Sequence, residues 1–133
     1  MDNSDIAKEW FVFSKRDLDT AIHLINTMNP KPLEIICYHS QQSAEKVLKG
    51  YLILNETMPP RTHDLLLLCD MCSQRDNEFI DIADNCSLIT MYGVQPRYPF
   101  EIDITDIDAE KATQIAGNIY SFVMQKVIAG SSI

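Results

Sequence analysis

Side chains of the kind that bind phosphate gather at three places along the chain. The first is a polar stripe formed by His39, Gln42, Lys46 and Lys49. Steps of three, four and three residues place these side chains on one face of a helix. Two lysines one turn apart can hold a phosphate, yet such a stripe is also the usual solvent-exposed face of a helix, and Glu45 lies beside it. The stripe alone therefore does not distinguish a ligand-binding face from a solvent-exposed one.

The second place is the tetrapeptide Arg61-Thr-His-Asp64, directly before an apolar run at residues 65–68. Free backbone N–H groups and the dipole at the start of a helix favour an anion, to which Arg61 would add a fixed charge. Alternatively, Thr62, His63 or Asp64 caps the helix and His63 packs under the loop. Both interpretations fit the residue types.

The third place is Arg97-Tyr98-Pro99. A guanidinium and a phenol next to a rigid proline can clamp a phosphate or stack on a base. Pairing of Arg97 with a carboxylate and burial of Tyr98 in the core explain the same residues equally well.

Other chemistries lack support in the sequence. The spacing shows no Ser/His/Asp or Cys/His nucleophile arrangement, and four glycines are too few for a Gly-rich phosphate loop. Acidic residues at 101–108 lack the glycine turn of a calcium loop. Cys69 and Cys72 form a Cys-x-x-Cys pair, but no second pair completes a zinc site. We therefore predict buried thiols, and no metal or cofactor.

Long helices are predicted to position these groups. Over about residues 5–28, an apolar stripe with helical spacing is formed by Ala7, Phe11, Ser14, Leu18, Ala21 and Ile25. Over about residues 32–54, a second stripe is formed by Leu33, Ile36, Ser40, Ala44, Val47, Tyr51 and Leu54. Further apolar residues widen the first stripe, so this helix should touch two neighbours. Only a proline-bearing corner separates the two helices, which favours an antiparallel hairpin.

The second half of the chain predicts shorter elements and one more long helix. A short helix follows Asp64, and a further helix through Phe79 ends near Tyr92. Residues 94–103 are expected to form an ordered loop. Thr105 and Asp108 resemble a capping box before the last helix. The apolar stripe of that helix comprises Ala112, Ile115, Ile119 and Phe122, and it is broadened by Ala116, Val123 and Val127. Residues 1–133 are thus predicted to form a single all-α domain, an up-and-down bundle of four to five helices.

Composition limits the class of protein. The net charge of −8 argues against general DNA binding, because affinity for phosphate backbones comes mostly from clustered cations. No run approaches the roughly 18 apolar residues of a spanning helix, and the acidic start resembles no signal peptide. We expect a cytoplasmic protein without membrane contact.

Three strings in order resemble the HEPN domain family: YHSQQSAEKVLKGYL at 38–52, PRTHDL at 60–65 and RYP at 97–99. The resemblance implies a helical bundle, commonly a homodimer, that binds nucleotides or RNA and often accompanies a separately encoded minimal nucleotidyltransferase. It also implies candidates for a nucleotide-binding cleft: Lys46, Lys49, Arg61, His63, Asp64, Arg97 and Tyr98.

Many members of that family are ribonucleases with an arginine followed, after four to six residues, by a histidine late in the bundle. Here Arg97 has no histidine after it, and leucines follow Arg61 at those positions. Arg16 and His23 match the spacing but belong to the first predicted helix. The leading hypothesis is a non-catalytic domain that dimerises and binds a nucleotide or a nucleotidyltransferase partner in a toxin–antitoxin-like system. The alternatives are a ribonuclease toxin with an atypical active site and a structural assembly partner without a ligand.

Overall fold

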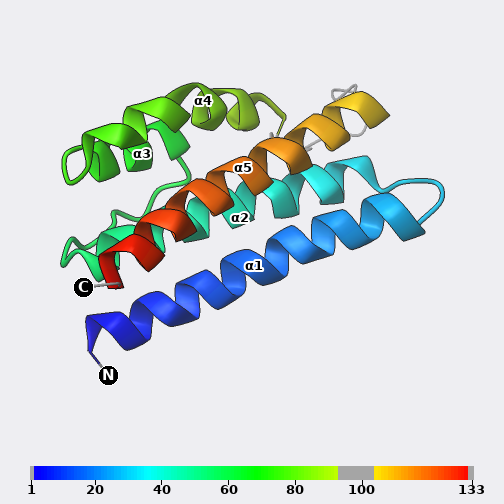
Figure 1. Ribbon diagram of the computed structural model, residues 1–133. Coiled ribbons are helices and arrows are strands. Elements are labelled where there is room, and N and C mark those ends of the chain that lie inside the picture. Colours follow the sequence, from blue (N-terminus) through cyan, green and yellow to red (C-terminus); the bar gives the residue numbers. More distant parts are fainter. Residues whose placement is uncertain (1, 93–103, 132–133) are drawn as a thin grey trace.

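The computed structural model describes residues 2–92 and 104–131, and all regular structure within them is helical (Figure 1). The elements are α1 (Asn3–Thr27), α2 (Leu33–Leu54), α3 (Leu65–Ser73), the 3₁₀ helix η1 (Asn77–Ile82), α4 (Ala83–Tyr92) and α5 (Asp106–Ser131). The predicted all-α bundle is confirmed. The predicted ordered loop at 94–103 lies outside the described residues.

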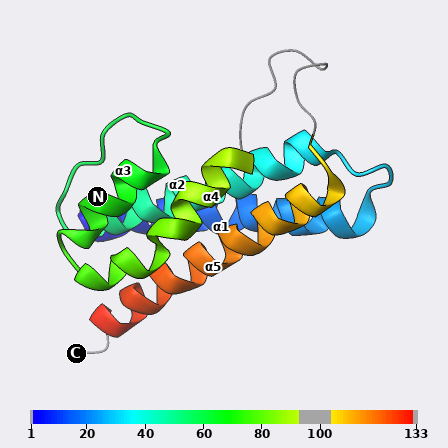
Figure 2. The same ribbon diagram turned by 90° about the horizontal axis from the view of Figure 1, so that it is seen from above.

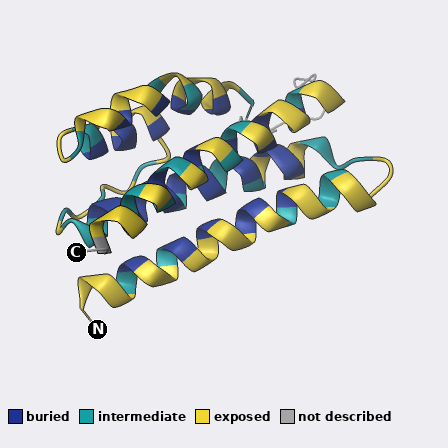
Figure 3. Ribbon diagram, viewed as in Figure 1, coloured by how far each residue is buried: buried dark blue, intermediate teal, exposed yellow. Residues whose placement is uncertain are grey.

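Helix α2 lies at the centre of the bundle. It packs along α1 as the predicted antiparallel hairpin, and α5 lies beside it, running opposite to α1 (Figure 1). Helices α3 and α4 form an arm over the half of α2 nearer its C-terminal end (Figure 2). On α1 and α5 a buried side faces the bundle and an exposed side faces away from it, whereas the central α2 is exposed only near its N-terminal end (Figure 3).

Local capping explains where several helices begin. Asp2 caps α1 by accepting a hydrogen bond from the Asp5 backbone N–H at 3.0 Å. At the start of α5, the Thr105 hydroxyl accepts from the Asp108 N–H while the Asp108 carboxylate accepts from the Thr105 N–H, each at 3.1 Å. The predicted capping box is thereby confirmed.

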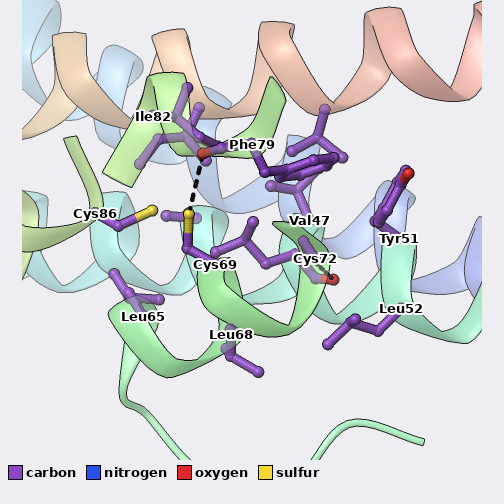
Figure 4. Close-up of a cluster of buried hydrophobic side chains, with 14 of the residues drawn as sticks. Val47, Tyr51, Leu52, Leu65, Leu68, Cys69, Cys72, Phe79, Ile82 and Cys86 are labelled. Carbon is purple, nitrogen blue, oxygen red and sulfur yellow. Dashed lines mark hydrogen bonds between the residues drawn. The ribbon is translucent and has the colours of Figure 1, made fainter. Parts of the chain in front are cut away.

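The core is apolar and rich in aromatic contacts under the α3–α4 arm (Figure 4). Phe79, on η1, packs against Tyr51 and Phe122 with ring centroids 4.6 and 5.2 Å away. Every residue of the predicted stripe of α1 is buried except Ile25, which is half-buried. Apolar periodicity thus predicted the inner face of α1 correctly.

Two predicted details differ from the structure. The element through Phe79 is divided, because the 3₁₀ turn η1 precedes the α-helical residues of α4. On α5, Ile115 and Phe122 of the predicted stripe are only half-buried. The fully buried side of α5 comprises Ala112 and Ile119 of that stripe, Ala116 and Val123 of its predicted broadening, and Ala109. The buried side differs because α5 packs against α1, α2 and α4, and small alanines permit close packing.

The thiols belong to this core. Cys37, Cys69, Cys72 and Cys86 are buried and free. Burial raises the pKa of Cys37 to about 11 and also raises the pKa of Cys72. A hydrogen bond between Cys69 and Cys86 lowers the pKa of the first and raises that of the second. Since all four are at most 1% exposed, they serve packing and are out of reach of a substrate.

Gly50 sets the separation of α1 and α2 near their contact with the core. A Cβ atom added there would lie 2.5 Å from Cε1 and 2.8 Å from Cδ1 of Phe11. Only a residue without a side chain allows α1 to approach this closely. Among the described residues, no helix combines the length and apolarity needed to cross a bilayer.

Candidate functional site

Two buried carboxylates organise the polar side of the α1–α2 hairpin. The first is Asp17 of α1, which is 9% exposed. It accepts hydrogen bonds from Nδ1 of His39 at 2.8 Å and from Nζ of Lys46 at 2.6 Å, both from α2. Because an unpaired buried carboxylate is costly, these two partners explain how Asp17 is tolerated between the helices. We call these residues the Asp17 cluster.

The second carboxylate is Glu45 of α2, which is 5% exposed. It accepts from Nζ of Lys49, one turn further along, at 3.0 Å and from Nδ1 of His63 at 2.8 Å. The Lys49 ammonium also lies 5.9 Å from the ring centroid of Trp10 on α1. This Glu45 cluster ties α2 to the loop before α3, and we define it as Glu45, Lys49 and His63.

The two clusters determine how the polar stripe of α2, which contains Lys46 and Lys49, is interpreted. Lys49 is buried, and Lys46 is half-buried against α1, so the stripe is not an open solvated face. Both ammonium groups are neutralised by a neighbouring carboxylate. Asp17 is the residue that sequence reasoning missed, and its place beside the buried Leu18 is the only local signal that could have found it.

His63 is the exposed member of the Glu45 cluster. Its side chain is 77% exposed although its Nδ1 is held by Glu45. The other ring nitrogen has no hydrogen-bond partner among the described residues. An imidazole whose orientation is set by a carboxylate can present this free nitrogen to a ligand as a donor or an acceptor.

The start of α3 contains two further predicted residues. Asp64 is the N-cap, and its carboxylate accepts from the N–H groups of Leu66 and Leu67, both at 3.1 Å. The capping alternative is thereby confirmed for Asp64, whereas His63 does not pack under the loop. Arg61 is exposed, and its side chain makes no hydrogen bond or ion pair with the described residues. Its guanidinium is available to an anion at this corner.

The structure thus brings together part of the predicted cleft. Lys49 and His63 meet at Glu45, and Lys46 lies one turn away on the Asp17 cluster. Arg97 and Tyr98 lie outside the described residues. Counting only residues 2–92 and 104–131, no group of three or more potential metal ligands forms a cluster.

A second surface feature was not predicted. An open groove of about 1480 Å³ runs between α1 and α5. Its apolar lining comprises Phe11, Val12, Tyr51, Tyr120, Met124 and Val127. Arg16 and His23 also line it, whereas none of Lys46, Lys49 and His63 does. The only sign of this groove in the sequence was the wide apolar stripe of the first helix, which predicted contacts with two neighbours.

A comparison with known protein families identifies the family to which this fold belongs. The sequence profile described as HEPN domain matches residues 7–127. The chain belongs to the HEPN domain family. The family resemblance deduced from the three strings is therefore confirmed.

Solved structures agree with this assignment. This HEPN domain is similar to TT1696 from Thermus thermophilus, with 22% identity and a TM-score of 0.74 over 90% of this chain and 97% of that one. It is similar to ST0689, an archaeal HEPN homologue, with 24% identity and a TM-score of 0.71 over 91% of this chain and 97% of that one. At such identities the likeness concerns the fold. No protein of curated function matches the chain.

Proposed function

We propose that this HEPN domain is a non-catalytic cytoplasmic module that forms a homodimer and binds a nucleotide or a short RNA beside the Glu45 cluster, as a partner of a minimal nucleotidyltransferase. The observation that carries the proposal is the exposed His63 imidazole, fixed by a buried carboxylate and lying two residues from the unpaired Arg61. The Arg61 guanidinium offers a fixed charge to a phosphate. His63 donates to it from Nε2 when both ring nitrogens carry a proton, because the Nδ1 proton is held by Glu45.

Lys46 and Lys49 support this site in a less direct way. Their charges are neutralised by Asp17 and Glu45, so in this arrangement they hold α2 and His63 in place. Asp64 likewise orients the corner by capping α3. Arg97 and Tyr98 remain candidate ligands in the same proposal.

Isothermal titration of the full chain with ATP, GTP and a short single-stranded RNA tests the binding. We expect saturable heat for at least one ligand and a loss of affinity of about tenfold in His63→Ala, as for one charge-assisted hydrogen bond. Lys111→Ala is the control because Lys111 is an exposed residue of α5 outside both clusters. Absence of heat with all three ligands, or equal affinities of the two variants, would refute binding at this site.

The partner and the dimer have their own tests. Light scattering of the purified chain should give twice the mass of one chain, and co-expression with a minimal nucleotidyltransferase of the same organism should yield a stable complex. A monomer that captures no nucleotidyltransferase would contradict this half of the proposal. A ligand-free assembly partner is the alternative in which the dimer forms while Arg61→Ala and Arg97→Ala change no assay.

One observation favours a ribonuclease as the second candidate. Arg16 and His23 both line the α1–α5 groove, about 10 Å apart along α1. An arginine can stabilise the charge of a phosphorane, and a histidine can transfer the proton. Incubation with total RNA decides between the candidates: cleavage that is lost in both Arg16→Ala and His23→Ala would establish the ribonuclease.

A further inference from the structure

The α1–α5 groove is an open surface feature that the proposed non-catalytic function does not use. Its walls are α1 and α5, and Tyr51 and Leu54 of α2 form its floor. The α3–α4 arm packs on α2 and α5 instead, so no element of the described chain covers the groove (Figures 1 and 2). Val12 of α1 faces it while 53% exposed.

The size of the groove suits a helix better than a small molecule. Its volume of about 1480 Å³ exceeds the roughly 300–1,000 Å³ of pockets that enclose small ligands. A cylinder about 10 Å across, the diameter of a helix, would fill that volume over a length of about 19 Å. This length corresponds to about 12 residues, or three to four turns.

The apolar lining has the spacing with which helices pack. Tyr120, Met124 and Val127 of α5 follow one another at steps of four and three residues, and all three are half-buried. Phe11 and Val12 oppose them from α1. A third helix lying between α1 and α5 would place its own residues at steps of three and four against this seam.

The charges along the α1 edge of the groove indicate which kind of helix would bind there. Lys15 pairs with Asp19, and Lys126 pairs with both Asp76 and Glu78, so neither lysine offers a free charge to the groove. Lys8 has no carboxylate partner within the described residues, and the same is true of Arg16. The two lie eight residues apart, about 12 Å along α1.

These two cations lie on the same edge of the groove, in a chain of net charge −8. Carboxylates seven or eight residues apart on a docked helix would meet both of them. A second copy fits less well, because a twofold contact joins the same patch of both chains, and the carboxylates of this patch, Asp19 and Asp76, are already paired.

We propose that the α1–α5 groove is a docking site for an acidic amphipathic helix of a partner protein. Apolar residues of that helix fill the seam over Val12 and Met124, and its carboxylates pair with Lys8 and Arg16. The groove contains none of the residues of the Asp17 and Glu45 clusters. The proposal therefore goes beyond nucleotide binding and can fail without it.

The test uses the isotope-labelled full chain and a peptide of about 14 residues with Leu at steps of three and four and Glu at the other positions. We expect saturable shifts in amide resonances along the groove faces of α1 and α5. A peptide with Lys in place of every Glu should bind at least about tenfold more weakly. Equal binding of the two peptides, scattered shifts or no shifts would overturn the proposal.

Variants of the chain give the second arm of the experiment. The double variant Lys8→Glu, Arg16→Glu should lower the affinity for the acidic peptide at least about tenfold, and Val12→Asp should do the same. Lys111→Glu is the control, because it changes an exposed charge on α5 outside the groove. Circular dichroism before titration shows that each variant is folded.

The same variants also distinguish a second copy from a foreign partner. Light scattering should give the same mass for the wild type and for Val12→Asp. If Val12→Asp instead converts a dimer into a monomer, the groove holds a second copy, and the assignment to a partner protein is overturned.

Discussion

Replacing Gly50 with alanine tests how closely α1 must approach α2. The new Cβ would lie 2.5 Å from Cε1 of Phe11 and 3.1 Å from Cβ of Trp10. Ordinary contacts of a Cβ atom begin at 3.4 Å, so the Phe11 ring must move by about 1 Å. That ring also lines the α1–α5 groove, so the substitution affects the groove as well as the hairpin.

Two opposing energy contributions set the size of the stability change in Gly50→Ala. Alanine is favoured over glycine inside a helix by about 0.8–1.0 kcal/mol. Overpacking a tight contact costs about 1–3 kcal/mol. The net change for Gly50→Ala is therefore a loss of about 0–2 kcal/mol in the free energy of unfolding. Gly117 on α5 provides the matched control, because nothing lies within 4 Å of its added Cβ. Gly117→Ala should raise the free energy of unfolding by up to about 1 kcal/mol.

Urea unfolding followed by far-UV circular dichroism measures both variants in one experiment. We expect Gly50→Ala to be less stable than Gly117→Ala by about 1–3 kcal/mol, the overpacking cost alone. If both substitutions stabilise the chain equally, α1 and α2 do not approach as closely as described, and the reasoning is refuted.

Three further predictions test single contacts. Asp64→Ala removes the cap of α3 and should lower the free energy of unfolding by about 0.5–2 kcal/mol. Asp64→Asn keeps a capping oxygen and should cost less. Equal losses of the two variants in urea unfolding would contradict the capping role. Asp17→Asn leaves its lysine partner without a counter-ion and should cost about 2–4 kcal/mol in the same assay, since that lysine is still partly hydrated. Asp19→Asn, at an exposed pair, should cost less than about 1 kcal/mol, and similar losses for Asp17 and Asp19 would argue against a buried cluster. A hydrogen bond from Lys126 lowers the pKa of Asp76 below its usual 3.8, so this carboxylate stabilises the fold above about pH 4 and loses its effect as pH falls through the lowered pKa. Stability measured from about pH 5 to 2 should fall less steeply in Asp76→Asn than in the wild type, and parallel curves would exclude the linkage.

Local patterns in the sequence were sufficient to predict the helices. The apolar stripe of α1, the capping box at Thr105 and the cap at Asp64 each depend on residues within a few turns of one another. Hydrophobic periodicity and capping are local effects, so one sequence reveals them. The three family strings are likewise short and contiguous. On α5, the predicted Ile115 and Phe122 are only half-buried because that helix packs against α1, α2 and α4, and this arrangement is not local.

The composition of the candidate site was decided by tertiary structure. The sequence shows that Lys49 lies on a polar face of its helix, but its burial depends on the carboxylate of Glu45 and on Trp10 of another helix. Asp17 is similar: a buried acid is tolerated only where cations from α2 reach it, and helix packing determines whether they do. The groove has the same origin, since α1 and α5 are far apart in the chain and only their packing on α2 leaves a space between them.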